Sequence, residues 1–106
     1  MGFFGSFRGP SMDEGVRQYR STPGALLVDV REPDEYAAGH VPGSVNLPLS
    51  QIRSAEQTLT DKSQPLFVYC LSGGRSSQAT AQLTRMGYQA VTNIGGISAY
   101  HGEVER

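Results

Sequence analysis

Two short apolar runs place the strongest limit on what this chain of 106 residues can fold into. Residues 26–30 (LLVDV) and 66–69 (LFVY) are apolar at nearly every position, and neither run alternates between apolar and polar residues. A half-exposed strand alternates, whereas a strand that is buried on both faces reads as a continuous apolar run. The two runs therefore predict buried strands of a parallel sheet.

The segments around these runs carry helix signals. Ser11 with Glu14 three residues later forms a capping box, which predicts a helix that runs to about residue 20. Pro33 can begin a short helix, and Gly39 can end it. A helix is also expected within 49–59, and another over 76–86, where the apolar residues recur on one face.

Three further strands complete the expected sheet. They are short segments at 3–7, 44–47 and 90–94, followed by a turn at Gly95 and Gly96. Strands that alternate with helices imply a parallel sheet with helices on both faces. The sequence therefore predicts one α/β domain over residues 1–106, with a central, mostly parallel sheet of five strands.

Composition excludes several classes of protein. Hydrophobic residues make up 38% and charged residues 18%, which suits a globular domain, and no apolar stretch approaches the roughly 18 residues that span a bilayer. No secretory signal is visible, so we expect a cytoplasmic protein without a membrane partner. One cysteine excludes an internal disulfide, and with two separated histidines it does not make a metal site. We expect no metal and no cofactor.

Charge is unevenly distributed along the chain. The net charge is −1, which argues against non-specific binding to nucleic acid. Residues 1–61 hold eight acids and five arginines, whereas residues 62–102 hold no acid. The basic residues of the acid-free stretch are Lys62, Arg75 and Arg85. This predicts cationic surroundings for Cys70, unless the gap is a chance feature or folding brings Asp29 or Glu35 nearby.

The single cysteine lies where a reactive thiol is expected. Cys70 directly follows the apolar run 66–69. After it comes the glycine-rich turn LSGGRS, which leads into the helix expected at 76–86. A helix N-terminus lowers the pKa of a thiol, and the thiolate is the nucleophile. Successive backbone N–H groups in such a turn form an anion-binding nest. The nucleophile and the anion-binding pocket would then both be formed by Cys70 and the turn that follows it.

Four motifs occur in order over residues 26–100. They are VDVRE with Glu35 and Tyr36, GHVPGSVNLP at 39–48, CLSGGRS at 70–76, and Gly95-Gly96 with Tyr100. Together they resemble the single-domain rhodaneses, a family of sulfurtransferases, although tryptophan is commoner at the final aromatic position. The resemblance implies a rhodanese-like fold, and it covers nearly the whole domain.

The resemblance also implies a persulfide mechanism. The Cys70 thiolate would attack the outer sulfur of thiosulfate, a polysulfide or a persulfide, and then pass it to cyanide, a thiol or a protein acceptor. Arg75 would bind the anionic donor or its leaving group. The expected binding residues are Leu71, Ser72, Gly73, Gly74, Arg75 and Ser76, of which Ser76 is expected to cap the following helix. A monomer or a weak homodimer is expected.

Four further residues are expected to support the site rather than react. Asp29 ends a buried strand, so its carboxylate must be paired, and Arg31 or nearby backbone could serve. Glu35 could pair with an arginine. His40 precedes Val-Pro-Gly and is expected to hold that turn by hydrogen bonding. His101 has no partner that the sequence identifies.

Two other functions compete with sulfur transfer. Related cell-cycle phosphatases share this fold and place five residues between cysteine and arginine. Here four residues separate Cys70 from Arg75, which matches the rhodanese pattern. The other alternative is a non-catalytic binding or sulfur-carrier module, because rhodanese-like domains also serve as parts of larger assemblies.

Overall fold

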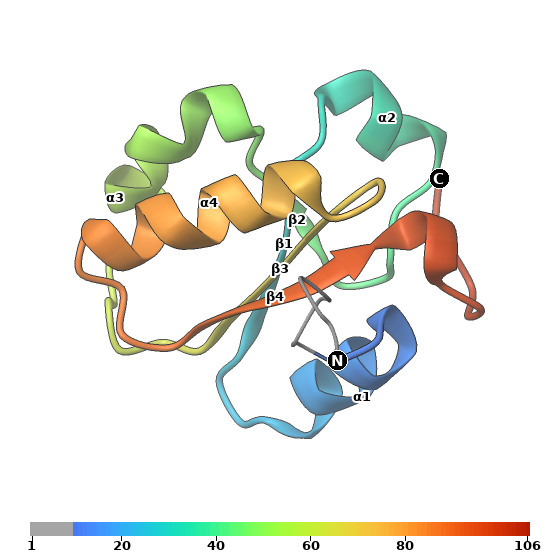
Figure 1. The fold of residues 1–106 in the computed structure, drawn as a ribbon, viewed down its shortest axis with the longest axis horizontal. Helices are drawn as coiled ribbons and strands as arrows, with labels where there is room; N and C mark the ends of the chain where they lie inside the picture. The colour runs from blue at the N-terminus through green and yellow to red at the C-terminus, as the bar shows by residue number, and fades with distance from the viewer. Residues whose placement is uncertain (1–9) are drawn as a thin grey trace, which may run out of the picture.

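A parallel sheet of four strands forms the centre of the protein in the computed structural model, which describes residues 10–106. The strands are β1 Leu26–Asp29, β2 Val45–Asn46, β3 Leu66–Cys70 and β4 Val91–Gly96. Their order is β2-β1-β3-β4, and every neighbouring pair is parallel (Figure 1). The α/β class is confirmed. The sequence predicted five strands, and the one expected at 3–7 lies outside the described residues.

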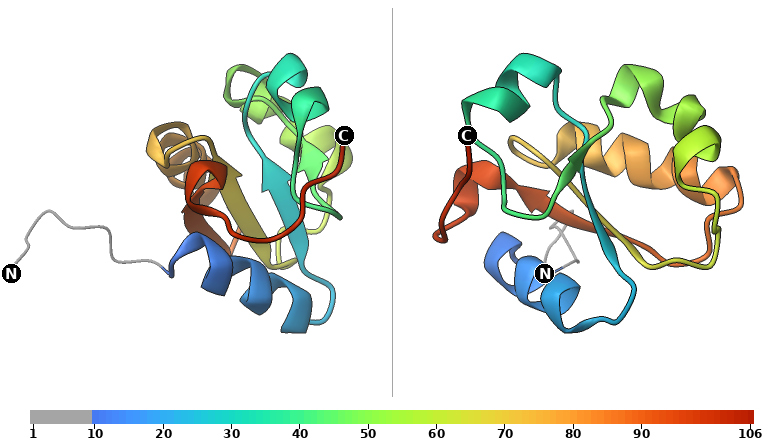
Figure 2. Two further views of the ribbon diagram at one scale, coloured as in Figure 1. Left: turned by 90° about the vertical axis from the view of Figure 1, so that its right-hand side faces the viewer. Right: turned by 180° about the vertical axis from the view of Figure 1, so that it is seen from behind.

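Helices cover both faces of this sheet, as predicted. The α-helices are α1 Met12–Ser21, α2 Pro33–Ala38, α3 Ala55–Thr58 and α4 Gly74–Arg85. In Figures 1 and 2, α1 lies on one face of the sheet, whereas α3 and α4 lie on the other. The short helix α2 lies near the carboxyl ends of the strands. None of the helices formed by residues 10–106 has the length and apolar character needed to cross a membrane.

The two faces of β3 explain why its sequence does not alternate. All five of its residues are buried. Phe67 and Tyr69 belong to a core cluster with α1, whereas Leu66, Val68 and Cys70 belong to a second cluster with α4. Because each face packs against a helix, each needs apolar side chains.

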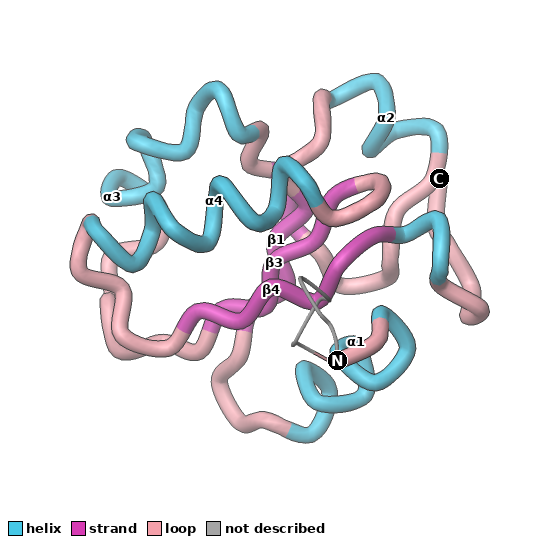
Figure 3. Tube along the Cα trace, in the orientation of Figure 1, coloured by secondary structure: helices cyan, strands magenta, loops and turns pink. Residues whose placement is uncertain are grey.

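Three elements differ locally from the sequence prediction. The helix expected within 49–59 begins as a 3₁₀ helix, η1 Leu49–Ser54, before it continues as α3. Helix α4 begins two residues earlier than expected. The glycine pair predicted as a turn instead ends β4, and the 3₁₀ helix η2 Ile97–Ala99 follows it (Figure 3). A bulge makes this possible, since Val68 pairs with Asn93 but Tyr69 pairs with Gly95.

Candidate active site

The sulfur of Cys70 caps the N-terminus of α4. The N-cap residue is Gly73, whose φ of 110° lies in the left-handed region that glycine adopts without strain. Its N–H donates to Cys70 Sγ at 3.0 Å, and the Ser76 N–H donates to the same atom at 3.3 Å. The prediction that Ser76 caps the helix is therefore wrong. The chain turns at Gly73, so Ser76 already lies within the first helical turn.

These contacts favour the ionised form of the thiol. Cys70 is 1% exposed, and burial alone would raise its pKa. The Ser76 hydroxyl and the N–H groups of Ser76, Gly73 and Ser72 outweigh burial, so the pKa of the Cys70 thiol is lowered. The N-terminal end of the α4 dipole acts in the same direction. The hydrogen-bond donors of the loop therefore favour the thiolate over the thiol.

Asn93 is a site residue that the sequence did not suggest. The fully buried Ser76 hydroxyl lies 2.7 Å from Asn93 Oδ1 and 3.4 Å from Cys70 Sγ. Asn93 Oδ1 also accepts the Gly95 N–H at 3.0 Å. The hydroxyl donates to Asn93 Oδ1 and accepts the Cys70 S–H, so Asn93 holds the hydroxyl oxygen beside the sulfur of the thiol form. When the thiol ionises, the hydroxyl proton can turn to the sulfur instead. In the sequence its one signal was a polar residue inside the strand expected at 90–94.

Substitution of Ser76 by alanine is expected to raise the pKa of the Cys70 thiol. The hydroxyl is lost, whereas the Ser76 N–H remains, so part of the stabilisation of the thiolate disappears. The measurement is the rate of Cys70 alkylation by iodoacetamide as a function of pH, whose midpoint should move upward. Ser77→Ala is the matched control, because Ser77 is exposed on the same helical turn. An unchanged midpoint in Ser76→Ala would show that the hydroxyl does not lower the pKa of the Cys70 thiol.

Two further N–H groups at this helix end are free to bind a ligand. Gly74 and Arg75 are the first residues of α4, and the first N–H groups of a helix have no partner within it. Among residues 10–106, neither N–H donates to any other group. Free N–H groups at a helix N-terminus favour a bound anion. An anion beside Cys70 Sγ would find these donors in place.

The side chain of Arg75 forms an ion pair with Glu35 of α2. Its Nη1 donates to Glu35 Oε1 at 2.7 Å, and its Nη2 donates to Oε2 at 3.0 Å. Arg75 and the Glu32 N–H lower the pKa of Glu35 to about 2. The charge of Arg75 is therefore balanced at neutral pH. The acid-free stretch of sequence does not give the loop a net positive charge, because α2 brings an acid to it.

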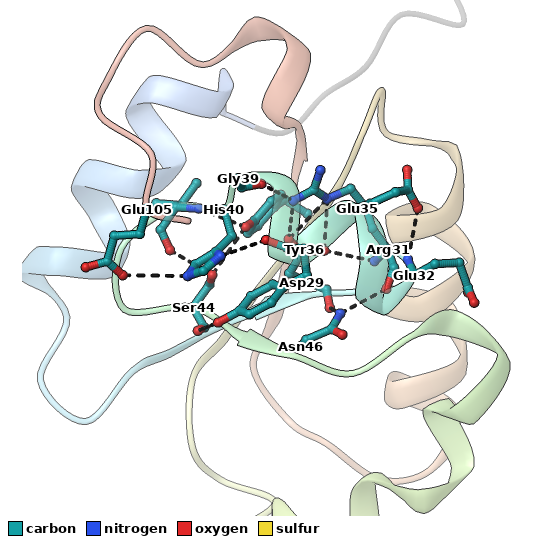
Figure 4. Close-up of polar contacts among 12 residues, drawn as sticks. Asp29, Arg31, Glu32, Glu35, Tyr36, Gly39, His40, Ser44, Asn46 and Glu105 are labelled. Atoms are coloured by element: carbon teal, nitrogen blue, oxygen red, sulfur yellow. Dashed lines mark hydrogen bonds and ion pairs between the residues drawn. The ribbon is translucent and has the colours of Figure 1, made fainter.

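A buried ion pair supports α2. Asp29 is fully buried and Arg31 is 5% exposed. Arg31 Nη2 donates to Asp29 Oδ2 at 2.7 Å and to the Gly39 carbonyl at 2.7 Å (Figure 4). Asn46 Nδ2 donates to the carbonyls of Asp29 and Arg31. The end of β1 is thus tied to both ends of the segment that carries Glu35.

The two histidines make contacts away from Cys70. His40 Nδ1 lies 2.8 Å from the Tyr36 carbonyl, the two rings stack at 3.8 Å, and His40 Nε2 lies 3.6 Å from Glu105 Oε1 (Figure 4). His101, for which the sequence identified no partner, lies 2.7 Å from Asp13 Oδ2. These contacts hold the C-terminal segment to α2 and α1.

The remaining residues of the loop are held by their backbone. Leu71 is 46% exposed, and its carbonyl accepts the Ser98 N–H at 3.0 Å. Ser72 and Gly74 are also exposed. The loop therefore exposes its backbone and the Leu71 side chain to solvent, whereas the sulfur of Cys70 is buried.

Comparison with known proteins assigns this architecture to a family. The family model for the rhodanese-like domain matches residues 13–103. The chain belongs to the rhodanese-like domain family. The resemblance carried by the four motifs is thereby confirmed, and it extends over α1 as well.

Several relatives of this rhodanese-like domain are described as sulfurtransferases. The chain is 41% identical to thiosulfate sulfurtransferase PspE of Escherichia coli, over 66% of this chain and 68% of that protein. It is 44% identical to a sulfurtransferase of Allochromatium vinosum, over 76% of this chain and 78% of that protein. An uncharacterised Bacillus subtilis protein, YqhL, is 37% identical, and the chain spans 64% of its length.

Solved structures show the same fold. An E. coli structure described as a rhodanese with anions superimposes with a TM-score of 0.72 at 34% identity, over 77% of this chain and 98% of that one. The family and its relatives support sulfur transfer as the general activity of such domains.

Proposed function

We propose that this rhodanese-like domain is a sulfurtransferase that carries a sulfane sulfur on Cys70 as a persulfide. The proposal rests on the capping of α4 by Cys70 Sγ, which accepts hydrogen bonds from the N–H groups of Gly73 and Ser76. The relatives described as thiosulfate sulfurtransferases and sulfurtransferases agree with it.

The reaction has two displacement steps. The Cys70 thiolate attacks the outer sulfur of thiosulfate, a new S–S bond forms, and the electron pair of the broken bond leaves with sulfite. The Cys70 persulfide anion then gives its outer sulfur to a thiophilic acceptor, such as cyanide, a thiol or a protein thiol, and the Cys70 thiolate is restored. No proton has to move in either step when the acceptor attacks as an anion, as cyanide or a thiolate does, in keeping with a sulfur that is surrounded by hydrogen-bond donors.

The N–H groups at the start of α4 would hold the transferred atom. The Gly74 and Arg75 N–H groups have no partner among residues 10–106, and they adjoin the two that bind Cys70 Sγ. Fixed donors aimed at the place where negative charge develops stabilise a transition state without reorganisation. Arg75 keeps further N–H groups beyond the two that bind Glu35, and these could contact the donor.

Mass spectrometry of the intact protein after exposure to thiosulfate tests the proposal. We expect the mass to rise by one sulfur atom, with the increase assigned to Cys70, and to fall back when cyanide is added. Cys70→Ala should gain no sulfur and should show no thiosulfate:cyanide sulfurtransferase activity. A wild-type protein that gains no sulfur from thiosulfate, polysulfide or persulfide would point instead to the non-catalytic binding module.

A further inference from the structure

We propose that Glu35 is a specificity-determining residue that makes the loop of residues 71–75 prefer sulfur donors with one negative charge over dianionic thiosulfate. Persulfides and thiosulfonates are the chemical class that fits. The inference rests on the proposed function, because it concerns the donor that Cys70 attacks.

The geometry places a carboxylate on the one cation of the loop. Arg75 directly precedes Ser76, whose N–H binds Cys70 Sγ, and the charge of Arg75 interacts with Cys70 through space. Glu35 engages this guanidinium through two hydrogen bonds of 2.7 and 3.0 Å. Glu35 Oε1 also accepts the Glu32 N–H at 2.9 Å, which holds the carboxylate toward the loop. A paired, two-pronged contact of this kind has defined geometry.

The other cations close to Arg75 in sequence or fold do not replace its charge. Arg31 is bound by the buried Asp29 carboxylate. Lys62 donates to Glu56 and to the Met86 carbonyl, and Arg85 lies in the last turn of α4. A helix of 12 residues is about 18 Å long, which exceeds the screening length of about 8 Å at physiological salt. Lys62 and Arg85 lie at the far end of α4, so their charges are screened from the loop.

The donors differ in how much charge they bring to this site. The neutral N–H groups of the loop can bind one anionic sulfur of any donor, but the second charge of thiosulfate meets a cation that Glu35 already balances. The reacting sulfur group of a persulfide or of a thiosulfonate carries a single charge. For a thiosulfonate, Cys70 Sγ bonds to the outer sulfur, the S–S bond breaks, and the electron pair leaves with the sulfinate, so charge and atoms balance.

Thiosulfate and methanethiosulfonate form a matched pair for the test, because a methyl group replaces one oxyanion. We expect Glu35→Gln to raise kcat/KM about tenfold for thiosulfate and about threefold for methanethiosulfonate, since the interaction of the freed Arg75 with a donor scales with the donor charge. Asp34→Asn is the matched control. It removes the same charge from an exposed position on the same helix, and both donors should change less than about twofold.

A second variant assigns the effect to Arg75. In the double variant Glu35→Gln with Arg75→Gln, the gain for thiosulfate should disappear, because no cation is freed. Thermal unfolding of each variant checks that it folds. Equal changes for the two donors in Glu35→Gln, or a loss with both, would show that Glu35 only supports the loop and would overturn the inference.

The wild-type protein provides a test that needs no variant. Because the ion pair is neutral overall, the ratio of kcat/KM for the two donors should change less than about twofold between about 0.1 and 0.5 M salt, a range in which the distant cations are screened. A steep loss of thiosulfate activity over this range would reveal an uncompensated cation and overturn the inference. If neither donor places a sulfur on Cys70, the proposed function itself fails, which is a different result from an unchanged donor preference.

Discussion

Substitution of Gly96 by alanine is expected to lower sulfur-transfer activity about a hundredfold and stability by about 3 kcal/mol. Gly96 is the last residue of β4. A Cβ atom there would overlap the Leu71 carbonyl oxygen and lie 2.5 Å from the Ser72 Cα. Both neighbours are backbone atoms, so no side-chain rotation can relieve the overlap. The loop would have to move away from β4, and its N–H groups would no longer be placed to donate hydrogen bonds to Cys70 Sγ.

Steady-state sulfur transfer and urea unfolding measure the two effects. Gly74→Ala is the control for stability, because a Cβ at Gly74 meets nothing within 4 Å and the residue begins α4. Alanine there should hold or raise the free energy of unfolding, by up to about 1 kcal/mol. Wild-type activity and an unchanged unfolding midpoint in Gly96→Ala would show that the close approach of loop and strand is not required.

Removal of the Asp29 carboxylate should cost about 3–5 kcal/mol of stability. Asp29→Ala leaves the guanidinium of Arg31, a residue that is 5% exposed, without its charge partner. Breaking a buried ion pair from one side is costly because the remaining charge stays in a medium that solvates it poorly. Arg31 also donates to the Gly39 carbonyl, so α2 and Glu35 should lose part of their support.

The double variant Asp29→Ala with Arg31→Met separates these effects. It leaves no unpaired charge, so urea unfolding should show a smaller loss of stability than in Asp29→Ala alone. If the double variant is the less stable of the two, the single variant does not suffer from an unpaired Arg31, and the loss comes from packing or from the contact with Gly39.

Local patterns predicted most of the secondary structure because they act within a few residues. The capping box at Ser11 and Glu14 is present in α1, and the apolar run before Cys70 is β3. The start of α4 was misjudged, since nothing in LSGGRS shows that Gly73 takes a left-handed conformation and that a sulfur, not a serine, receives the helix N–H groups.

The partners of the site residues were less predictable because they lie far apart in the chain. Ser76 and Asn93 are 17 residues apart, and Glu35 and Arg75 are 40 apart. Each is an ordinary polar residue in its own segment. They meet only because parallel strands bring their carboxyl ends to one edge of the sheet.

The sequence by itself determined the α/β class and indicated the candidate nucleophile, because continuous apolar runs require burial on both faces and the one cysteine follows such a run. It also predicted positive charge around that cysteine unless folding brought Asp29 or Glu35 nearby, and the tertiary structure decided this by placing Glu35 on Arg75. Charge acts through space rather than along the chain, so α2 could place Glu35 on Arg75 and leave the thiolate to be stabilised by backbone N–H groups.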